Sequence, residues 1–525
     1  MLARLNAPDA PPGLKRGLGL ALSPLVSLVV LTPLFVVTIP PLHDYPFHLA
    51  RADAIAALMG QTAHVTRYQL GSFLLPNVGM DVITLGLTAL LPPILAGRVF
   101  LGVVLLTMLS GTVALHRALH GRFSPWPLLA AFFLYNWIFL YGFTNYLVGV
   151  GIMLWGVAAW LAAGPANVVT KSLVGTILSV ISLFCHLMAF GLFAVILGGL
   201  ALTETIARWR ETRRLALGPL LLPAIPLGVA LAIFVVLSPT AGQVQEPIEY
   251  APWIGWKPLM AYRTVLWSIP WLDRVTVAPI VVLVALAAWR RRLRLAHAMI
   301  LPIALLVFTF IVMPYGLFGS LYGDARLPIA VLLVMIASVD LGPVPHRMLI
   351  ASTALAVGLL IARDAAIARA WHAEAPVIAE YRAAFEALPA GSTLYTASAE
   401  PFPKLAYASA AELARWHPPL KHMASLASIG HDVFVPSTWA DPFKQPIAVP
   451  PRDMAAKLLQ GDNPFQTPTA DGLADVVARI RALRGPGSMA LEFLLLLRPD
   501  ALTGTPPPGL VAVAHGGTFT LFRIE

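Results

Sequence analysis

Four ionisable side chains follow directly after the first hydrophobic stretch of the chain. They are His43, Asp44, His48 and Arg51, in the segment HDYPFHLAR. A carboxylate and imidazoles can exchange protons with a substrate, and a guanidinium can bind an anion. The segment therefore predicts chemistry close to a membrane surface.

The preceding apolar run, Leu18 to Ile39, positions these residues. About twenty residues at ~1.5 Å each are enough to cross ~30 Å of hydrocarbon, so Asp44 is expected where the chain leaves the bilayer. If a helix begins at Asp44, then His48 and Arg51 share one face with it and form a polar pocket wall. Alternatively, Asp44 is only the N-cap of that helix, with Pro46 in its first turn. The two interpretations are compatible.

Composition places the chain among polytopic membrane proteins. It is 58% hydrophobic and 12% charged, with a mean hydropathy of +0.77. The net charge of +10 comes from basic clusters between apolar runs, which indicates control of topology and not nucleic-acid binding. Lys15 and Arg16 precede the first span and no cleavage site follows it, so we expect a signal anchor.

Hydropathy predicts about eleven transmembrane helices. After the first, they are expected near residues 98–116, 126–141, 145–163, 172–186, 187–207, 216–238, 276–289, 297–315, 327–341 and 347–362. With a cytoplasmic N-terminus, most basic clusters fall on the cytoplasmic side of a bacterial inner membrane. The C-terminus is then periplasmic.

Two domains are expected on this basis. Residues 1–362 form the transmembrane domain, whose periplasmic loop 41–97 carries two surface helices near 46–59 and 80–91. Residues 363–525 form a small periplasmic α/β domain, with a helix over 365–388 and strands at 392–396, 492–497 and 518–524. We expect this tail to shape access of the acceptor and not to supply a catalytic base.

The order of these parts resembles the GT-C class of membrane glycosyltransferases, which includes protein O-mannosyltransferases and aminoarabinose transferases. The resemblance rests on the signal-anchor helix, Asp44 at its outer end, the two surface helices, Arg98 opening the second span and the outer tail. Tyr45 follows Asp44 where many relatives carry an acidic pair. A second carboxylate and metal dependence are therefore not carried over to this chain.

The resemblance implies transfer of a sugar from a polyprenyl-phosphate carrier to a glycan, lipid or protein acceptor at the periplasmic face. Asp44 would be the general base for an inverting attack on the anomeric carbon, with His43, His48 and Arg51 binding substrate. The leaving polyprenyl phosphate needs positive charge.

Candidates for that charge are the basic residues at the outer ends of spans. Lys257 and Arg263 lie in the loop 239–275, where they could equally be solvated. Arg326 could bind the phosphate or pair with Asp324. His186, inside a span, is a further substrate-binding candidate or a packed, hydrogen-bonded histidine.

No cofactor is expected. His43 and His48 could ligate a divalent metal together with Asp44, but their spacing is not diagnostic. Two other classes of protein fit the span count. A transporter or flippase would show more polar residues at mid-membrane and repeated halves, and a non-catalytic envelope assembly protein would use the tail for binding.

Overall fold

The computed structural model describes residues 11–164, 167–243, 247–251, 255–266, 269–317, 319–401, 420–483 and 491–525. The chain divides into two compact units. The helical unit comprises Met1–Val36 and Leu101–Arg369, and the mixed unit comprises Val37–Phe100 and Ala370–Glu525. The sequence predicted a domain boundary between residues 362 and 363. That position and the boundary after Arg369 both lie within the helix α14 (His346–Glu386).

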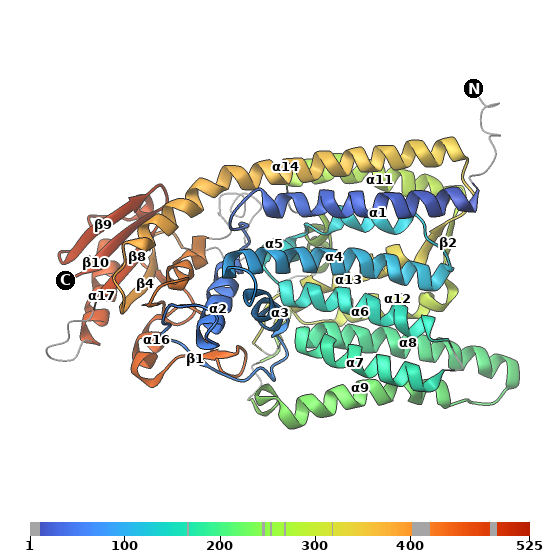
Figure 1. Cartoon of the computed structure of the whole chain (residues 1–525), viewed down its shortest axis with the longest axis horizontal. Helices are drawn as coiled ribbons and strands as arrows, with labels where there is room; N and C mark the ends of the chain where they lie inside the picture. The colour runs from blue at the N-terminus through green and yellow to red at the C-terminus, as the bar shows by residue number, and fades with distance from the viewer. Residues whose placement is uncertain are drawn as a thin grey trace. The chain divides into compact units, whose positions relative to one another are not determined.

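Long apolar helices make up most of the helical unit, because its Leu-, Val- and Ala-rich runs satisfy their backbone groups internally. They are α1 (Pro12–Phe35), α4 (Pro93–His120), α6 (Thr144–Ala162), α7 (Val168–Cys185), α8 (Leu187–Thr212), α9 (Gly218–Leu237), α11 (Pro270–Trp289) and α14. These eight are long and apolar enough to cross a membrane. In Figure 1, α6, α7, α8 and α9 lie alongside one another, and each packs against at least one of the others.

Shorter helices occupy the other predicted spans. They are the 3-10 helix η2 (Trp126–Phe133) with α5 (Trp137–Tyr141), α12 (Ile300–Val312) and α13 (Gly323–Ser338). The helix α10 (Trp256–Leu266) packs on α13. Every predicted span therefore holds helical structure, and the total of eleven crossings remains a prediction.

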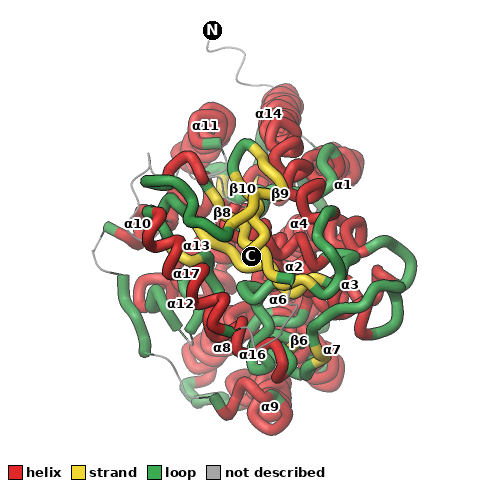
Figure 2. Tube along the Cα trace, turned by 90° about the vertical axis from the view of Figure 1, so that its left-hand side faces the viewer, coloured by secondary structure: helices red, strands yellow, loops and turns green. Residues whose placement is uncertain are grey.

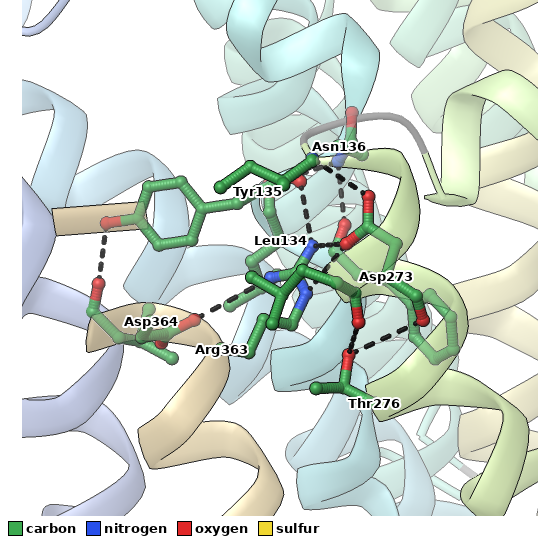
Figure 3. Close-up of polar contacts among 11 residues, drawn as sticks. Leu134, Tyr135, Asn136, Asp273, Thr276, Arg363 and Asp364 are labelled. Atoms are coloured by element: carbon green, nitrogen blue, oxygen red, sulfur yellow. Dashed lines mark hydrogen bonds and ion pairs between the residues drawn. The ribbon is translucent and has the colours of Figure 1, made fainter. Parts of the chain in front are cut away.

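A buried ion pair links distant helices of this unit (Figure 3). Arg363 of α14 donates from Nε to Oδ1 of Asp273 on α11, at 3.0 Å, and from Nη2 to the carbonyl of Tyr135, at 3.2 Å. Both charged side chains are fully buried. Asp364 lies 3.6 Å from the same guanidinium. A charge inside an apolar bundle is tolerated when it is paired in this way.

Three segments that carry basic residues meet the segment 339–342 at one end of the helical unit. The ammonium of Lys15 donates to the carbonyls of Leu341 and Gly342, at 2.8 and 2.7 Å. Arg122 pairs with Asp340. The strand β2 (Leu293–Leu295), which ends the basic run Arg290–Arg294, pairs antiparallel with β3 (Val339–Leu341).

The mixed unit contains the two predicted short helices and a sheet. The helices α2 (Tyr45–Leu58) and α3 (Gly79–Thr88) confirm the helices expected near 46–59 and 80–91. Gly97 allows α4 to approach α2 closely, because a Cβ there would lie 2.4 Å from Leu49 Cδ2 and 2.7 Å from the Tyr45 hydroxyl.

Six strands form the sheet, and Figure 2 shows several of them in yellow. They are β4 (Ser392–Ser398), β5 (Val433–Phe434), β7 (Phe465–Gln466), β8 (Glu492–Leu497), β9 (Leu510–Gly516) and β10 (Phe519–Ile524). The order is β5-β4-β8-β10-β9, with β7 also pairing with β4. β4 is parallel to β5, β7 and β8, whereas β10 is antiparallel to β8 and β9. The three predicted strands are confirmed as β4, β8 and β10.

Further helices complete this unit. They are α16 (Met454–Gln460), α17 (Ala470–Ala482) and the 3-10 helices η5 (Leu420–Ser428) and η6 (Pro451–Asp453). Leu473, Val477 and Ile480 of α17 pack against Tyr395 and Leu494 of the sheet. The small α/β domain expected at the C-terminus is therefore present.

The segment 37–100 is joined to the tail by a second pairing within the mixed unit. β1 (Gln69–Leu70) pairs antiparallel with β6 (Ile447–Ala448). The hydroxyl of Tyr68, beside this strand, donates to the carbonyl of Val435, at 3.1 Å. These contacts join the segment 37–100 to the C-terminal part of the same unit.

Candidate functional site

Asp44 lies at the N-cap position of α2, with Pro46 in the first turn, as one of the two interpretations requires. Its side chain makes no capping hydrogen bond, however. The backbone carbonyl of Asp44 accepts from the amide of His48, at 3.3 Å. Asp44 is buried, with 4% of its surface exposed. A capping role alone therefore does not explain why the carboxylate is buried.

Two imidazoles face this carboxylate. Nε2 of His43 lies 3.8 Å from Oδ1 of Asp44, and Nε2 of His422, on η5, lies 3.5 Å from the same oxygen. Burial lowers the pKa of His422 well below its ordinary value, and its electrostatic interactions with His43, Lys421 and His48 act in the same direction. Its imidazole is therefore neutral at pH 7.

Aromatic rings enclose the same place. The Phe47 ring lies 4.2 Å from the His422 ring and 4.6 Å from the Trp439 ring, between centroids. Trp439 also lies 5.7 Å from His422. We call His43, Asp44, Phe47, His422 and Trp439 the Asp44 cluster. Polar groups within an aromatic surround are typical of ligand sites.

Lys421 adds a positive charge beside this cluster. Burial lowers the pKa of Lys421, and the charge of Asp44 opposes that effect.

Arg51 is fully buried and holds the mixed unit together. Its guanidinium binds both carboxylate oxygens of Asp81 on α3, at 2.6 and 3.2 Å, and donates to Oε1 of Gln445, at 2.6 Å. Nη2 also lies 3.1 Å from Nδ1 of His48. Burial raises the pKa of Asp81, and Arg51 opposes that shift. These contacts give Arg51 a structural role, and its binding of substrate remains a prediction.

A second group of polar and aromatic residues, which we call the Arg326 cluster, lies in the helical unit. It consists of Arg326, His186, Phe143, Tyr146 and Ser320. Nη1 of Arg326 lies 3.0 Å from Nε2 of His186, and Nη2 donates to the Ser320 hydroxyl, at 2.8 Å. The guanidinium carbon lies 4.0 Å from the centre of the Phe143 ring. The Tyr146 hydroxyl donates to the backbone carbonyl of Arg326, at 2.8 Å.

Asp324 has a different partner from the one considered from sequence. Nζ of Lys257 lies 3.1 Å from Oδ2 of Asp324, and the indole of Trp256 donates to the same oxygen, at 2.9 Å. Lys257 also donates to the carbonyls of Phe310 and Met313. Lys257 is therefore paired and not simply solvated.

His186 and Arg263 lie in the same unit. His186 separates α7 from α8, and its Nδ1 accepts from the amide of Met188, at 3.1 Å. Arg263 is a buried residue of α10. The hydroxyl of the adjacent residue, Thr264, donates to the carbonyl of Ala325, at 2.9 Å. The substrate-binding roles of both residues remain predictions.

The sequence analysis missed two members of the Asp44 cluster, His422 and Trp439. Both stand in segments that carry no motif, and Trp439 lies in a loop between β5 and β6. Only the fold brings them to residues 43–47.

Comparison with known proteins supports one structural relationship. No protein-family model matches the sequence, and no curated protein matches it. The fold is similar to that of ArnT from Cupriavidus metallidurans bound to undecaprenyl phosphate, with a TM-score of 0.55 and 11% identity, covering 97% of this chain and 98% of that chain. The apo structure of the same protein matches with a TM-score of 0.51 and 12% identity, covering 96% and 97%. The predicted GT-C-like membrane fold is thereby confirmed.

Proposed function

We propose that the protein is a membrane glycosyltransferase that moves a sugar from a polyprenyl-phosphate carrier to an acceptor at the periplasmic face of the bacterial inner membrane. A fold alone does not define an activity. The observation that carries the proposal is the buried Asp44 carboxylate, faced by two imidazoles and enclosed by Phe47 and Trp439. The similarity to a structure bound to undecaprenyl phosphate supports a lipid-linked donor.

In the proposed reaction, Asp44 accepts the proton of the acceptor hydroxyl. The freed oxygen attacks the anomeric carbon from the side opposite the phosphate, the bond from that carbon to the phosphate oxygen breaks, and the configuration inverts. A positioned general base contributes ~10²–10⁴-fold to such a step.

The leaving phosphate carries the negative charge that develops. We assign its stabilisation to a cation of the helical unit, with Arg326 as the first candidate. A guanidinium binds phosphate through paired, charge-assisted hydrogen bonds. This assignment is tested separately from that of Asp44.

The test is transfer from a radiolabelled polyprenyl-phosphate sugar by the full-length protein in nanodiscs. Asp44→Asn keeps the size of the side chain and its ability to cap a helix but cannot accept a proton at neutral pH. We expect transfer to fall by ~10²-fold or more, equivalent to ~2.7 kcal/mol in the barrier.

Asp441→Asn is the matched control. Oδ1 of Asp441 accepts from the amide of Phe443, at 2.9 Å, a bond that asparagine can also make. This variant should transfer sugar like the wild type. Unchanged transfer by an Asp44→Asn protein with a wild-type melting temperature would refute the proposed mechanism.

A further inference from the structure

Three metal-binding side chains converge in the mixed unit, and one of them comes from a part of the chain remote from the other two. His43 and Asp44 precede α2, whereas His422 lies on η5. One possible ligand atom from each residue lies within 4.8 Å of the other two, and all three residues are buried.

Two of the separations within this group approach those of ligands around an ion. The His43 and His422 nitrogens lie 3.8 and 3.5 Å from Asp44 Oδ1, which is longer than an ordinary N–H···O hydrogen bond of ~2.7–3.2 Å. Bonds of about 2.0–2.2 Å in a tetrahedral arrangement place two ligand atoms roughly 3.3–3.6 Å apart. Both distances to Oδ1 are close to that value, and all three ligand atoms lie within 4.8 Å of one another.

We propose that His43, Asp44 and His422 bind one divalent cation of the zinc class, through the two Nε2 atoms and Oδ1. Two imidazoles with one carboxylate suit zinc, whereas magnesium and calcium prefer sets made of oxygen. Three protein ligands leave a fourth position for water or a substrate oxygen, as catalytic zinc sites do. The site rests on this geometry and not on the proposed transfer reaction, in which Asp44 acts as a base with no cation bound to it.

The environment of the His422 ring favours a bound cation. The Phe47 and Trp439 rings around it lower the local dielectric, which strengthens the attraction between a cation and Asp44.

Lys421 is an alternative source of the positive charge that balances the buried carboxylate of Asp44. Its ammonium interacts electrostatically with that carboxylate. In the metal-free protein Lys421 then balances Asp44, and a bound cation would be repelled by it. Removing the lysine charge should therefore strengthen metal binding, whereas a site that served only a Lys–Asp pair would bind no metal in either protein.

The experiment uses the full-length protein in detergent, stripped with a chelator and dialysed. Co²⁺ is titrated in first, and the intense visible absorption of four-coordinate cobalt reports the geometry. Zn²⁺ should then displace the cobalt, following the usual order of affinities, and mass spectrometry of the metal should give one ion per chain. His422→Ala should weaken binding by more than the ~10–100-fold that loss of an outer-shell partner costs.

Matched variants keep the test decisive. His515→Ala on β9 and His48→Ala should bind zinc like the wild type, since neither histidine belongs to the triplet. Lys421→Ala should bind it more tightly. If His422→Ala fails to fold, His422→Gln, which keeps a polar side chain of similar length, replaces it.

Absence of stoichiometric binding by the wild type would overturn the proposal, and so would undiminished binding by a folded His422 variant. Because binding is measured without donor or acceptor, neither result bears on sugar transfer. A protein that binds zinc but transfers no sugar would reject the transferase proposal alone.

Discussion

Arg326 and Lys257 differ in what holds their charges. Lys257 is paired with the fully buried carboxylate of Asp324. Arg326 contacts His186, the Ser320 hydroxyl and the Phe143 ring. We assign the phosphate to Arg326 and not to Lys257, because Lys257 already neutralises a carboxylate.

We expect Arg326→Gln to lower sugar transfer by at least ~10²-fold, the usual cost of losing one stabilising donor in a transition state. Lys257→Gln should instead lower the melting temperature, because it leaves Asp324 buried without its cation. Transfer and thermal melting are measured for both variants in nanodiscs. Equal losses of transfer by two well-folded variants would contradict the assignment of the phosphate to Arg326.

The sequence revealed the part of the Asp44 cluster that is continuous in the chain. His43 and Asp44 are adjacent in the chain, so both were candidates from their position alone. His422 and Trp439 could not be found in this way, because their proximity depends on the pairing of β1 with β6 and on the packing of η5 against α2. Long-range contacts of this kind leave no periodic signal in one sequence.

At the level of elements, Arg67 connects the loop before β1 to the sheet. It pairs with the buried carboxylate of Asp453, and its Nη1 donates to the carbonyls of Gly391 and Ser392, both at 3.1 Å, and to the Thr393 hydroxyl, at 3.0 Å. Arg67 thus links the segment 37–100 to the C-terminal part of the mixed unit.

Arg67→Ala should destabilise this unit by about 3 kcal/mol, because it leaves the carboxylate of Asp453 buried without its main partner. Arg452→Ala is the control, since Arg452 also lies 3.4 Å from that carboxylate but its side chain is 71% exposed. Thermal melting and limited proteolysis of the full-length variants provide the measurement. Comparable destabilisation by the two substitutions would show that burial of the ion pair is not the cause.

A second contact in the same loop should depend on pH. Nε2 of His64 lies 2.9 Å from Oδ2 of Asp53, which also accepts from the amide of Gly430, at 3.0 Å. The hydrogen bond with Asp53 raises the pKa of His64, against the opposing effect of burial.

Because the folded pKa is the higher one, this contact stabilises the protein fully below the unfolded pKa of about 6.5, and the stabilisation is lost as the pH rises through the folded pKa. We therefore expect His64→Gln to lower the melting temperature more at about pH 5.5 than at about pH 8.5. Equal differences at the two pH values would contradict a charged His64.

Helices were predictable where composition was uniform, and less so where it changed. The shift from Leu and Val to Ala, Glu and Arg near residue 363 indicated a new domain, yet α14 continues from His346 to Glu386. Ala, Glu and Arg favour helix as strongly as Leu does, so a change in polarity there marks a change of environment and not the end of the element. The short strands β5, β6 and β7 carry too few residues to be predicted from their pattern.

At the level of the whole molecule, the distribution of charge supports the predicted topology. Lys15, Arg122 and the 290–295 cluster all contact the segment 339–342, at one end of the helical unit. The positive-inside rule assigns such an end to the cytoplasm. From sequence, these segments could be assigned to the same side of the membrane only by counting spans. In the structure they are in direct contact.

Reporter tags should test this orientation in cells. We expect tags after Glu211 and Arg292 to report the cytoplasm, because both positions follow basic clusters that the rule places inside. Tags within 61–78 and after Glu525 should report the periplasm, as an odd number of crossings requires. The span count and the orientation are separable, since the loop 61–78 follows a single span whereas Glu525 follows all of them. If the loop is periplasmic and the C-terminus cytoplasmic, one of the three short helical segments does not cross the membrane; these are η2 with α5, α12, and α13. If the loop is cytoplasmic, the first span has the reverse orientation, and Asp44 lies on the side opposite to the proposed reaction.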